Sequence, residues 1–409
     1  MILKEVLREI AKSQRKAIIE SDVGVMREKT AEIDIKTPFA LVISGIRRCG
    51  KSTLLHQVIT KKENFYYFNF EDPRTAAFEV ADFQKLNDIF IEEFGKANYY
   101  FLDEIQNVQK WELFVRQMLD KKMHFVLTGS NASLLSRELG TRLTGRHLRY
   151  ELFPFSFNEF LKFAKLSPSI SSFETYFKDG GFPEYLKNKH TEILNELLNN
   201  IIARDIVVRY KLRNSKLLKE IAVYMLTNVG KEFSYNSLKK IFGLGSTNSA
   251  ISFISHFEDS YLLFIVPKFS YSLKSQMRNP KKIYAIDNGL AVANSASFSE
   301  DKGRMLENLV FLHLRRKYRD IYYFKERYEC DFLIREKGKI TGVFQVCLEL
   351  NDDNKDREIK GLQEALEKLN LDRGTILTFN QEDELIVSGK RIKIKPVWKW
   401  LVAPGGTSN

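Results

Sequence analysis

The chain has 409 residues, of which 44% are hydrophobic and 12% aromatic, so we expect a folded protein of two to four domains, not a disordered one. No hydrophobic run approaches the roughly 18 residues of a membrane-spanning helix, and the N-terminal segment lacks the hydrophobic core of a signal peptide. The formal net charge of +12 at pH 7 fits either a polyanionic partner or a solvated basic surface. The cysteines Cys49, Cys330 and Cys347 are scattered and odd in number, which predicts a reducing cytoplasm and not a disulfide framework, and no pair of them has zinc spacing. Together with the missing hydrophobic run, this predicts a cytoplasmic protein without membrane association.

Residues 1–35 predict a helix followed by a polar linker. From residue 36 to residue 153, short hydrophobic segments alternate with helical periods, which predicts a parallel sheet with helices on both faces. In such a sheet the ligand binds at the carboxyl ends of the strands. The expected strands cover residues 39–44, 64–70, 98–102, 124–128 and 148–152.

A complete phosphate-binding loop, with the spacing G-x-x-x-x-G-K-S, joins the first of these strands to a helix. Its backbone N–H groups and the helix dipole would bind phosphate oxygens, so we expect a nucleoside triphosphate; the alternative is a glycine turn without a ligand. Lys51 would contact the β- and γ-phosphates, and the Ser52 hydroxyl would bind Mg²⁺. Arg47 and Arg48 are either solvated or contact a phosphate or carboxylate of a partner. The residues expected to contact the nucleotide are Gly45, Ile46, Arg47, Arg48, Cys49, Gly50, Lys51, Ser52 and Thr53.

Two carboxylates, Asp103 and Glu104, follow the strand of residues 98–102. Asp103 would hold Mg²⁺ through its water shell, and Glu104 would be the general base that activates water. Alone, such a pair is equally typical of a solvated turn, but its place about fifty residues after the phosphate loop favours hydrolysis. After the next strand, Asn131, together with Thr128 or Ser130, either senses the γ-phosphate or caps a helix.

Four arginines come next in the chain, and one of them is a candidate to stabilise the charge of the transition state. We consider Arg142 and Arg146 the best candidates, acting on this chain's own nucleotide or on a neighbour's. Ordinary ion pairing is the alternative for each of them.

Beyond this core the pattern changes three times. Residues 154–212 predict a helical lid, and residues 213–300 predict a winged helix, because three helical periods precede two short strands. Residues 301–403 predict a second α/β domain, and residues 404–409 a disordered tail.

The winged-helix segment offers candidate DNA contacts at Thr247, Asn248 and Ser249, which open a helix. The alternative is that these side chains cap the helix and that the wing contacts protein. Basic residues that could surround a DNA site are Lys239, Lys240, Lys268, Lys274, Arg278, Lys281 and Lys282.

Several motifs together resemble a broad family of archaeal and bacterial AAA+-type ATPases, in which an ATPase core precedes a winged helix and a restriction-endonuclease-like domain. The motifs are GIRRCGKSTLL (45–55), LDEIQ (102–106), LTGS (127–130), ELFPFSFNEF (151–160), GGFPEYL (180–186), LENLVFLHL (306–314), CDFLI (330–334), QVCLEL (345–350) and VWKWL (397–401). The resemblance implies ATP as the nucleotide, with the roles given above for Lys51, Ser52, Asp103 and Glu104. It also makes a ring-shaped oligomer possible.

The sequence departs from this family's nuclease pattern in the C-terminal domain. Asp331 and Glu307 stand where metal-binding carboxylates belong, but Gln345 and Cys347 occupy the places of the second acid and the lysine. Glutamine cannot supply an anionic ligand and cysteine cannot replace an ammonium, so we expect a catalytically inactive scaffold.

The leading hypothesis is therefore an α/β P-loop ATPase, dependent on Mg²⁺, whose nucleotide state moves the C-terminal domains on a partner, with nucleic acid (DNA) as the first candidate. One alternative is a signalling-type nucleotide switch that acts on a protein partner. The other, disfavoured by Gln345 and Cys347, is an active DNA nuclease.

Overall fold

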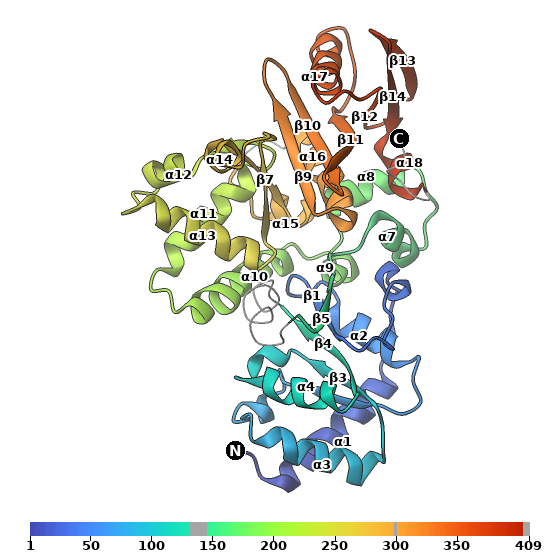
Figure 1. Cartoon of the computed structure of the whole chain (residues 1–409), viewed down its shortest axis with the longest axis vertical. Coiled ribbons are helices and arrows are strands. Elements are labelled where there is room, and N and C mark those ends of the chain that lie inside the picture. The colour runs from blue at the N-terminus through green and yellow to red at the C-terminus, as the bar shows by residue number, and fades with distance from the viewer. Residues whose placement is uncertain (131–144, 298–300, 404–409) are drawn as a thin grey trace. The chain divides into compact units, whose positions relative to one another are not determined.

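The computed structural model describes residues 1–130, 145–297 and 301–403, and Figure 1 labels its helices and strands. Contacts within the chain divide it into two compact units, Met1–Phe153 and Pro154–Asn409, which are described one at a time.

The N-terminal unit contains a parallel sheet covered by helices. Its strands are β1 (Ala40–Ser44), β2 (Tyr66–Asn69), β3 (Tyr99–Asp103), β4 (His124–Gly129) and β5 (His147–Glu151). Its helices are α1 (Lys4–Glu20), α2 (Lys51–Ile59), α3 (Asp82–Phe94) and α4 (Trp111–Asp120), with short 3₁₀ turns at η1 (Glu28–Ala31), η2 (Pro73–Thr75) and η3 (Ile105–Asn107). The strand order is β2-β3-β4-β1-β5 and every neighbouring pair is parallel. The predicted α/β class with a parallel-sheet core is confirmed.

Aromatic side chains fill the space between the sheet and helices α3 and α4. Tyr100 stacks on Phe125 with ring centroids 4.8 Å apart, and Phe83 stacks on Phe114 at 4.7 Å. Helix α1 packs along α3 and the edge strand β2, so the open edge of that strand is covered.

The predicted polar linker between α1 and β1 packs against α2. The fully buried side chain of Gln57 joins the two segments. Its Nε2 donates to the carbonyl oxygens of Val23 and Val25 at 2.9 and 2.8 Å, and its Oε1 accepts from the Arg27 backbone N–H at 3.0 Å. The linker is therefore a fixed part of this unit, because a side chain of α2 satisfies its backbone groups.

The C-terminal unit begins with short helices. They are α7 (Phe157–Ala164), α8 (Ile170–Asp179), α9 (Pro183–Asn188) and α10 (Glu192–Asn200), and the last continues into a π-helical segment, η4 (Ile201–Val208). The turn before α9 is tied to a later part of the unit, because the Gly181 N–H donates to Asp287 Oδ2 at 2.6 Å.

A small three-stranded antiparallel sheet with flanking helices follows. Its elements in chain order are α11 (Ser215–Thr227), β6 (Glu232–Phe233), α12 (Tyr235–Ile241), α13 (Thr247–Asp259), β7 (Leu263–Pro267), α14 (Leu273–Arg278), β8 (Lys281–Ala285) and α15 (Asn288–Ala293). The strand order is β6-β8-β7, so the middle strand β8 pairs with both others.

A second, six-stranded sheet completes the C-terminal unit. Its elements are α16 (Lys302–Lys317), β9 (Asp320–Lys325), β10 (Glu329–Glu336), β11 (Lys339–Val346), α17 (Lys355–Lys368), β12 (Arg373–Thr378), β13 (Asp383–Val387), β14 (Lys390–Pro396) and α18 (Val397–Val402). The order is β13-β14-β12-β11-β10-β9, with parallel pairs β11–β12 and β12–β14 at its centre. Helix α17 packs on this sheet through Leu362, Ala365 and Leu366.

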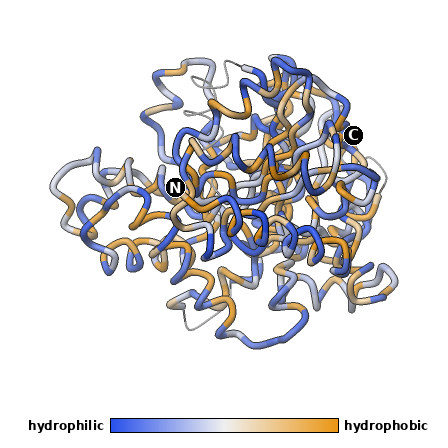
Figure 2. Tube along the Cα trace, turned by 90° about the horizontal axis from the view of Figure 1, so that it is seen from below, coloured by the Kyte–Doolittle hydropathy of each residue, from blue (hydrophilic) through white to orange (hydrophobic). Residues whose placement is uncertain are grey.

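Among the described residues, the helices are all too short or too polar to span a lipid bilayer. Figure 2 agrees, because hydrophobic stretches of the trace are repeatedly interrupted by hydrophilic ones.

Candidate nucleotide-binding site

The phosphate loop connects β1 to α2 through a backbone that requires glycine at two positions. Gly50 has φ of 96°, a left-handed conformation that strains other residues. A Cβ at Gly45 would lie 2.1 Å from the Leu152 carbonyl oxygen, so a larger residue would displace the backbone there. The sequence motif therefore matches the geometry that the structure shows.

Lys51 is the first residue of α2, and its side chain turns back into the loop. It is buried, and Nζ lies 3.2 Å from the Gly45 carbonyl oxygen and 3.3 Å from that of Ile46. The same ammonium lies 3.6 Å from Glu104 Oε1 at the end of β3. The structure thus brings together the predicted phosphate-binding lysine and the predicted general base.

Asp103 ends β3 in a fully buried position beside Glu104. Its Oδ1 accepts a hydrogen bond from the Thr128 hydroxyl, and its Oδ2 has no hydrogen-bond partner among the described residues. Burial, and then the neighbouring Glu104 carboxylate, raise the pKa of Asp103 to about 6; the hydroxyls of Thr128 and Ser52 and the Lys51 ammonium oppose this rise. A buried carboxylate oxygen without a partner, beside the Ser52 hydroxyl, fits a Mg²⁺ site.

Glu104 has an unusual backbone conformation and several polar contacts. Its φ of 50° places a non-glycine residue in the left-handed region, where strain is often found at functional sites. Its backbone N–H donates to Thr128 Oγ1 at 2.9 Å. Gln106 Nε2 donates to Glu104 Oε2 and lies 3.5 Å from Ser130 Oγ. Sequence reasoning missed Gln106 as a site residue, although it belongs to the LDEIQ motif.

The strand β4 lies between β1 and β3, so its carboxyl end lies between the phosphate loop and the two carboxylates. Thr128 and Ser130 are therefore in the region that was predicted for a γ-phosphate contact. Both are buried, and both take part in the polar contacts described above. The third candidate, Asn131, lies outside the described residues.

Arg27 supports the phosphate loop from the N-terminal linker, a role that sequence reasoning did not identify. Its buried guanidinium donates to the carbonyl oxygens of Cys49 and Phe153, at 2.7 Å each. A Cβ added at Gly50 would lie 3.1 Å from this guanidinium. The phosphate loop is therefore contacted by Lys51 of its own helix α2 and by Arg27 of the linker.

The predicted arginines occupy different places. Arg47 pairs with Glu71 at 3.2 Å. Arg146 directly precedes β5, whose first residue His147 lies opposite Ala40 at the amino end of β1, and its guanidinium pairs with Asp120. Because the phosphate loop follows the other end of β1, the structure does not support contact of Arg146 with this chain's own γ-phosphate. Action on a neighbour's nucleotide stays a prediction, and Arg142 lies outside the described residues.

In the C-terminal unit, the structure gathers the residues that sequence reasoning assigned to a degenerate nuclease site. Glu307 Oε1 and Asp331 Oδ1 bind one cation, the Lys282 ammonium, at 2.8 and 2.9 Å. Gln345 Oε1 accepts from the Asp331 backbone N–H at 3.2 Å. Cys347 is buried, and burial raises the pKa of its thiol to about 12. The prediction that Lys282 belongs to an exposed basic surface is wrong, because this side chain is only 3% exposed.

The candidate DNA-contact residues form the first turn of α13. Ser246 caps this helix and its Oγ accepts from the Ser249 N–H at 3.1 Å. Asn248 is exposed and Thr247 half-buried. Capping, one of the two interpretations from the sequence, is thus present at Ser249, while Asn248 and Thr247 remain accessible.

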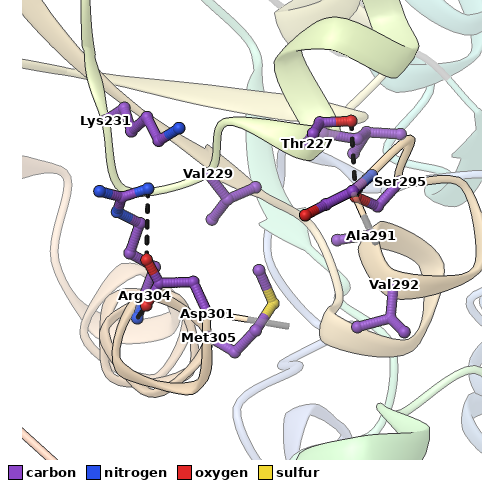
Figure 3. A pocket seen from close by; sticks show the side chains of 11 residues that line it. Thr227, Val229, Lys231, Ala291, Val292, Ser295, Asp301, Arg304 and Met305 are labelled. Atoms are coloured by element: carbon purple, nitrogen blue, oxygen red, sulfur yellow. Dashed lines mark hydrogen bonds and ion pairs between the residues drawn. The ribbon is translucent and has the colours of Figure 1, made fainter. Parts of the chain in front are cut away.

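The C-terminal unit also contains a pocket of about 400 Å³ between the end of α11 and helices α15 and α16 (Figure 3). Arg304 pairs with Asp301 at 3.3 Å on its wall, and Ser295 Oγ lies 3.5 Å from Thr227 Oγ1. Because these polar groups contact one another, we assign no ligand to this pocket.

Comparison with known families places an AAA domain at residues 37–161. Two domains of unknown function follow, DUF8612 at residues 170–301 and DUF4143 at residues 302–400. A solved structure, that of AMPPCP-bound DnaA from Aquifex aeolicus, aligns with 61% of this chain and 88% of that chain, with 14% identity and a TM-score of 0.28.

Several curated proteins match over most of their length. An uncharacterized protein of Haemophilus influenzae is 31% identical over 340 residues, which cover 78% of this chain and 84% of that protein. The uncharacterized protein MJ1544 of Methanocaldococcus jannaschii is 38% identical over 391 residues, which cover 88% of this chain and 87% of that protein. The chain therefore belongs to the same family as MJ1544, and its AAA domain has a nucleotide-binding, ATPase-like fold.

Proposed function

We propose that the N-terminal unit hydrolyses ATP with the help of Mg²⁺. The observation that carries this proposal is the convergence of Lys51, Asp103 and Glu104 beside the phosphate loop, with Lys51 Nζ 3.6 Å from Glu104 Oε1. An isolated phosphate loop binds nucleotide only, whereas hydrolysis also needs a positioned base and a cation site. The assignment of ATP rests on the AAA domain match.

Each side chain has a distinct role in this proposal. Ser52 and Asp103 would hold Mg²⁺, which neutralises charge on the phosphate oxygens when it is bound. Lys51 would exchange its contacts with loop carbonyl oxygens for phosphate oxygens. Glu104 would take a proton from the attacking water, held in place by its backbone bond to Thr128 and its side-chain bond to Gln106.

Two substitutions test this proposal. Glu104→Gln keeps the shape of the side chain but removes the base, so it should retain nucleotide and lower turnover by roughly 10²–10⁴-fold. Lys51→Ala should abolish nucleotide binding. Phosphate release and binding of a fluorescent ATP analogue measure the two effects, with the exposed Glu63→Gln as control. Equal turnover by Glu104→Gln and the control would contradict the assignment of the base.

We propose further that the nucleotide state moves the C-terminal unit on DNA. The order α11, β6, α12, α13, β7, α14, β8, with strands arranged β6-β8-β7, resembles a winged helix that carries a short extra helix, α14, between β7 and β8; in this arrangement α13 would enter the major groove. Charge supports this choice of partner. Residues 233–257 and 260–286 contain no aspartate or glutamate, while Lys240, Lys274 and Arg278 are exposed.

Salt dependence of binding tests the DNA proposal. Affinity for a duplex should fall steeply with added salt, because bound phosphates release counterions. Lys274→Ala combined with Arg278→Ala should lower the salt slope by about 1–2, whereas Lys355→Ala with Lys360→Ala, two exposed lysines on α17, should leave it unchanged. Fluorescence anisotropy with a labelled duplex measures both slopes. Affinity that does not depend on salt would contradict DNA as the partner.

A nucleotide switch that acts on a protein is the second candidate. It is favoured by exposed hydrophobic side chains between β7 and β8, where Tyr271 is 82% exposed and Leu273 and Met277 are 70% exposed each. Such side chains are typical of protein interfaces. Slow turnover, tightly retained nucleotide and a monomeric state would favour this candidate.

A further inference from the structure

Three carboxylates of the C-terminal unit, Glu307, Glu329 and Asp331, surround the ammonium of Lys282. The distances from Nζ to their nearest oxygens are 2.8, 2.7 and 2.9 Å. We call these three carboxylates the acid cluster. Lys282 lies on β8 in the small sheet, whereas the acid cluster lies on α16 and β10, which belong to the six-stranded sheet region. One cation thus connects two regions that different family profiles match.

Lys282 and two members of the acid cluster, Asp331 and Glu307, are buried, so their charges must satisfy one another. The third member, Glu329, is 33% exposed and also pairs with Lys325 at 3.0 Å. The side chains of Lys282, Asp331 and Glu307 are 3%, 7% and 11% exposed. Isolated charges at such sites are strongly unfavourable, and only close ion pairs and hydrogen bonds offset the loss of hydration. Burial lowers the pKa of Lys282, but Asp331 and Glu307 outweigh it and raise that pKa well above its usual value. The lysine is therefore charged at neutral pH.

Other polar groups complete the shell around the acid cluster. Tyr284 donates its hydroxyl to Glu307 Oε1 at 2.6 Å, and the Val346 N–H donates to Asp331 Oδ2 at 2.9 Å. Gln345 is fixed by the Asp331 N–H and by Glu358, to which its Nε2 donates at 2.6 Å. In the part of the chain that the structure describes, no group of three acidic, histidine or cysteine side chains is arranged to hold a metal. The Mg²⁺ implied by the nuclease resemblance does not fit here.

We propose that Lys282 is the permanent cation of the acid cluster. It stands where the resemblance to nucleases would place a metal ion, and it fastens β8 to α16 and β10. The C-terminal domain then needs no metal, and the two C-terminal regions move as one body. This inference concerns the C-terminal unit alone, so it does not depend on ATP hydrolysis.

Further contacts across the same boundary support a single body. The Ala285 N–H donates to Asn308 Oδ1 at 2.8 Å, and Asn308 Nδ2 donates to Asn288 Oδ1 at 2.8 Å. The ring of Tyr284 stacks on Phe311 of α16 with centroids 4.4 Å apart. These contacts involve both the strand that carries Lys282 and the helix that carries Glu307.

Thermal unfolding of the full-length, nucleotide-free protein tests the proposal. Lys282→Met keeps most of the side-chain volume but leaves the buried carboxylates without their cation, so Tm should fall by about 10 °C or more. The control Lys274→Met replaces an exposed lysine of the same region and should shift Tm by less than about 2 °C. Lys282→Met with Glu307→Gln removes charge on both sides and should regain part of the loss. Equal Tm values for Lys282→Met and the control would overturn the proposal.

Hydrogen exchange separates a joining role from local stabilisation. In folded Lys282→Met, amides of both β8 and β10 should exchange faster than in the wild type. Faster exchange confined to β8 would overturn the claim that Lys282 fastens the two regions together.

The wild-type protein keeps the proposal testable if Lys282→Met does not fold. Elemental analysis should find no divalent metal in nucleotide-free protein, and EDTA should leave Tm unchanged. A bound metal, or a lower Tm in EDTA, would overturn the proposal. Incubation of the protein with plasmid and Mg²⁺ or Mn²⁺ should give no cleavage of the DNA. Cleavage would overturn the proposal, because Lys282 would then be the lysine of an active nuclease site.

Discussion

At the scale of single residues, Thr128 holds two groups of the nucleotide site at once. Its hydroxyl donates to Asp103 Oδ1 and accepts from the Glu104 N–H at 2.9 Å. It therefore positions the proposed cation ligand and the strained backbone of the proposed base. We expect Thr128→Val, which keeps the shape but removes the hydroxyl, to lower turnover by about 10- to 100-fold, because two buried polar groups lose their partner.

Thr128→Ser is the matched control, since it restores a hydroxyl in the same place. Phosphate release should recover in the serine variant, while binding of nucleotide should change little in either one. If the serine variant lost as much turnover as the valine variant, the hydroxyl would not account for the loss, and the positioning role would be contradicted.

How far the site could be predicted depends on how its residues are spaced in the sequence. Lys51 and Ser52 adjoin the loop glycines in one short motif, and the Asp103–Glu104 pair follows a recognisable hydrophobic strand. Arg27 and Lys282 could not be found in this way. Arg27 acts on Cys49 and Phe153, and Lys282 on Glu307 and Asp331, and no local pattern marks pairs so distant in sequence.

At the scale of elements, the linker between α1 and β1 supports the phosphate loop through Arg27. We expect Arg27→Met to weaken nucleotide binding by about tenfold, because the loop carbonyl of Cys49 loses a charge-assisted hydrogen bond and the loop is less firmly held. Titration with a fluorescent ATP analogue measures the change. The exposed Arg74→Met, whose guanidinium pairs with Asp72 at 2.7 Å and donates to Ser13 Oγ at 3.1 Å, away from the phosphate loop, is the control. Unchanged affinity in Arg27→Met would show that the loop holds its conformation without the linker.

The alternation of strands and helices could be predicted, but the order of the strands could not. Hydrophobic segments mark β1, β3 and β4 in the sequence, whereas the place of β4 between the other two depends on how the helical connections cross. That order decides which side chains share the site. The packing of the linker could not be predicted for a similar reason, because its backbone carbonyl groups accept hydrogen bonds from Gln57 of α2, a residue distant in the sequence.

At the scale of the whole molecule, the position of Arg146 bears on assembly. It lies at the amino end of β5, away from its own phosphate loop, and its partner Asp120 is 60% exposed. An arginine at a surface can reach the nucleotide of an adjacent copy, where it would stabilise the charge of the transition state. An oligomer would then be required for hydrolysis, and each copy would complete its neighbour's site.

Mixing two inactive variants tests this arrangement. Arg146→Ala should lower turnover by roughly 10³-fold if the arginine acts on a neighbour, and Glu104→Gln is inactive because its own base is missing. In a mixture, an Arg146→Ala copy retains Lys51 and Glu104 and receives the arginine of a Glu104→Gln neighbour, so part of the turnover should return. Asp120→Asn, which frees Arg146 from its ion pair, should remain active. Full activity of Arg146→Ala alone would show that this arginine has no role in hydrolysis and only forms its ion pair with Asp120. A mixture that stayed inactive would contradict the action of Arg146 on a neighbour's nucleotide.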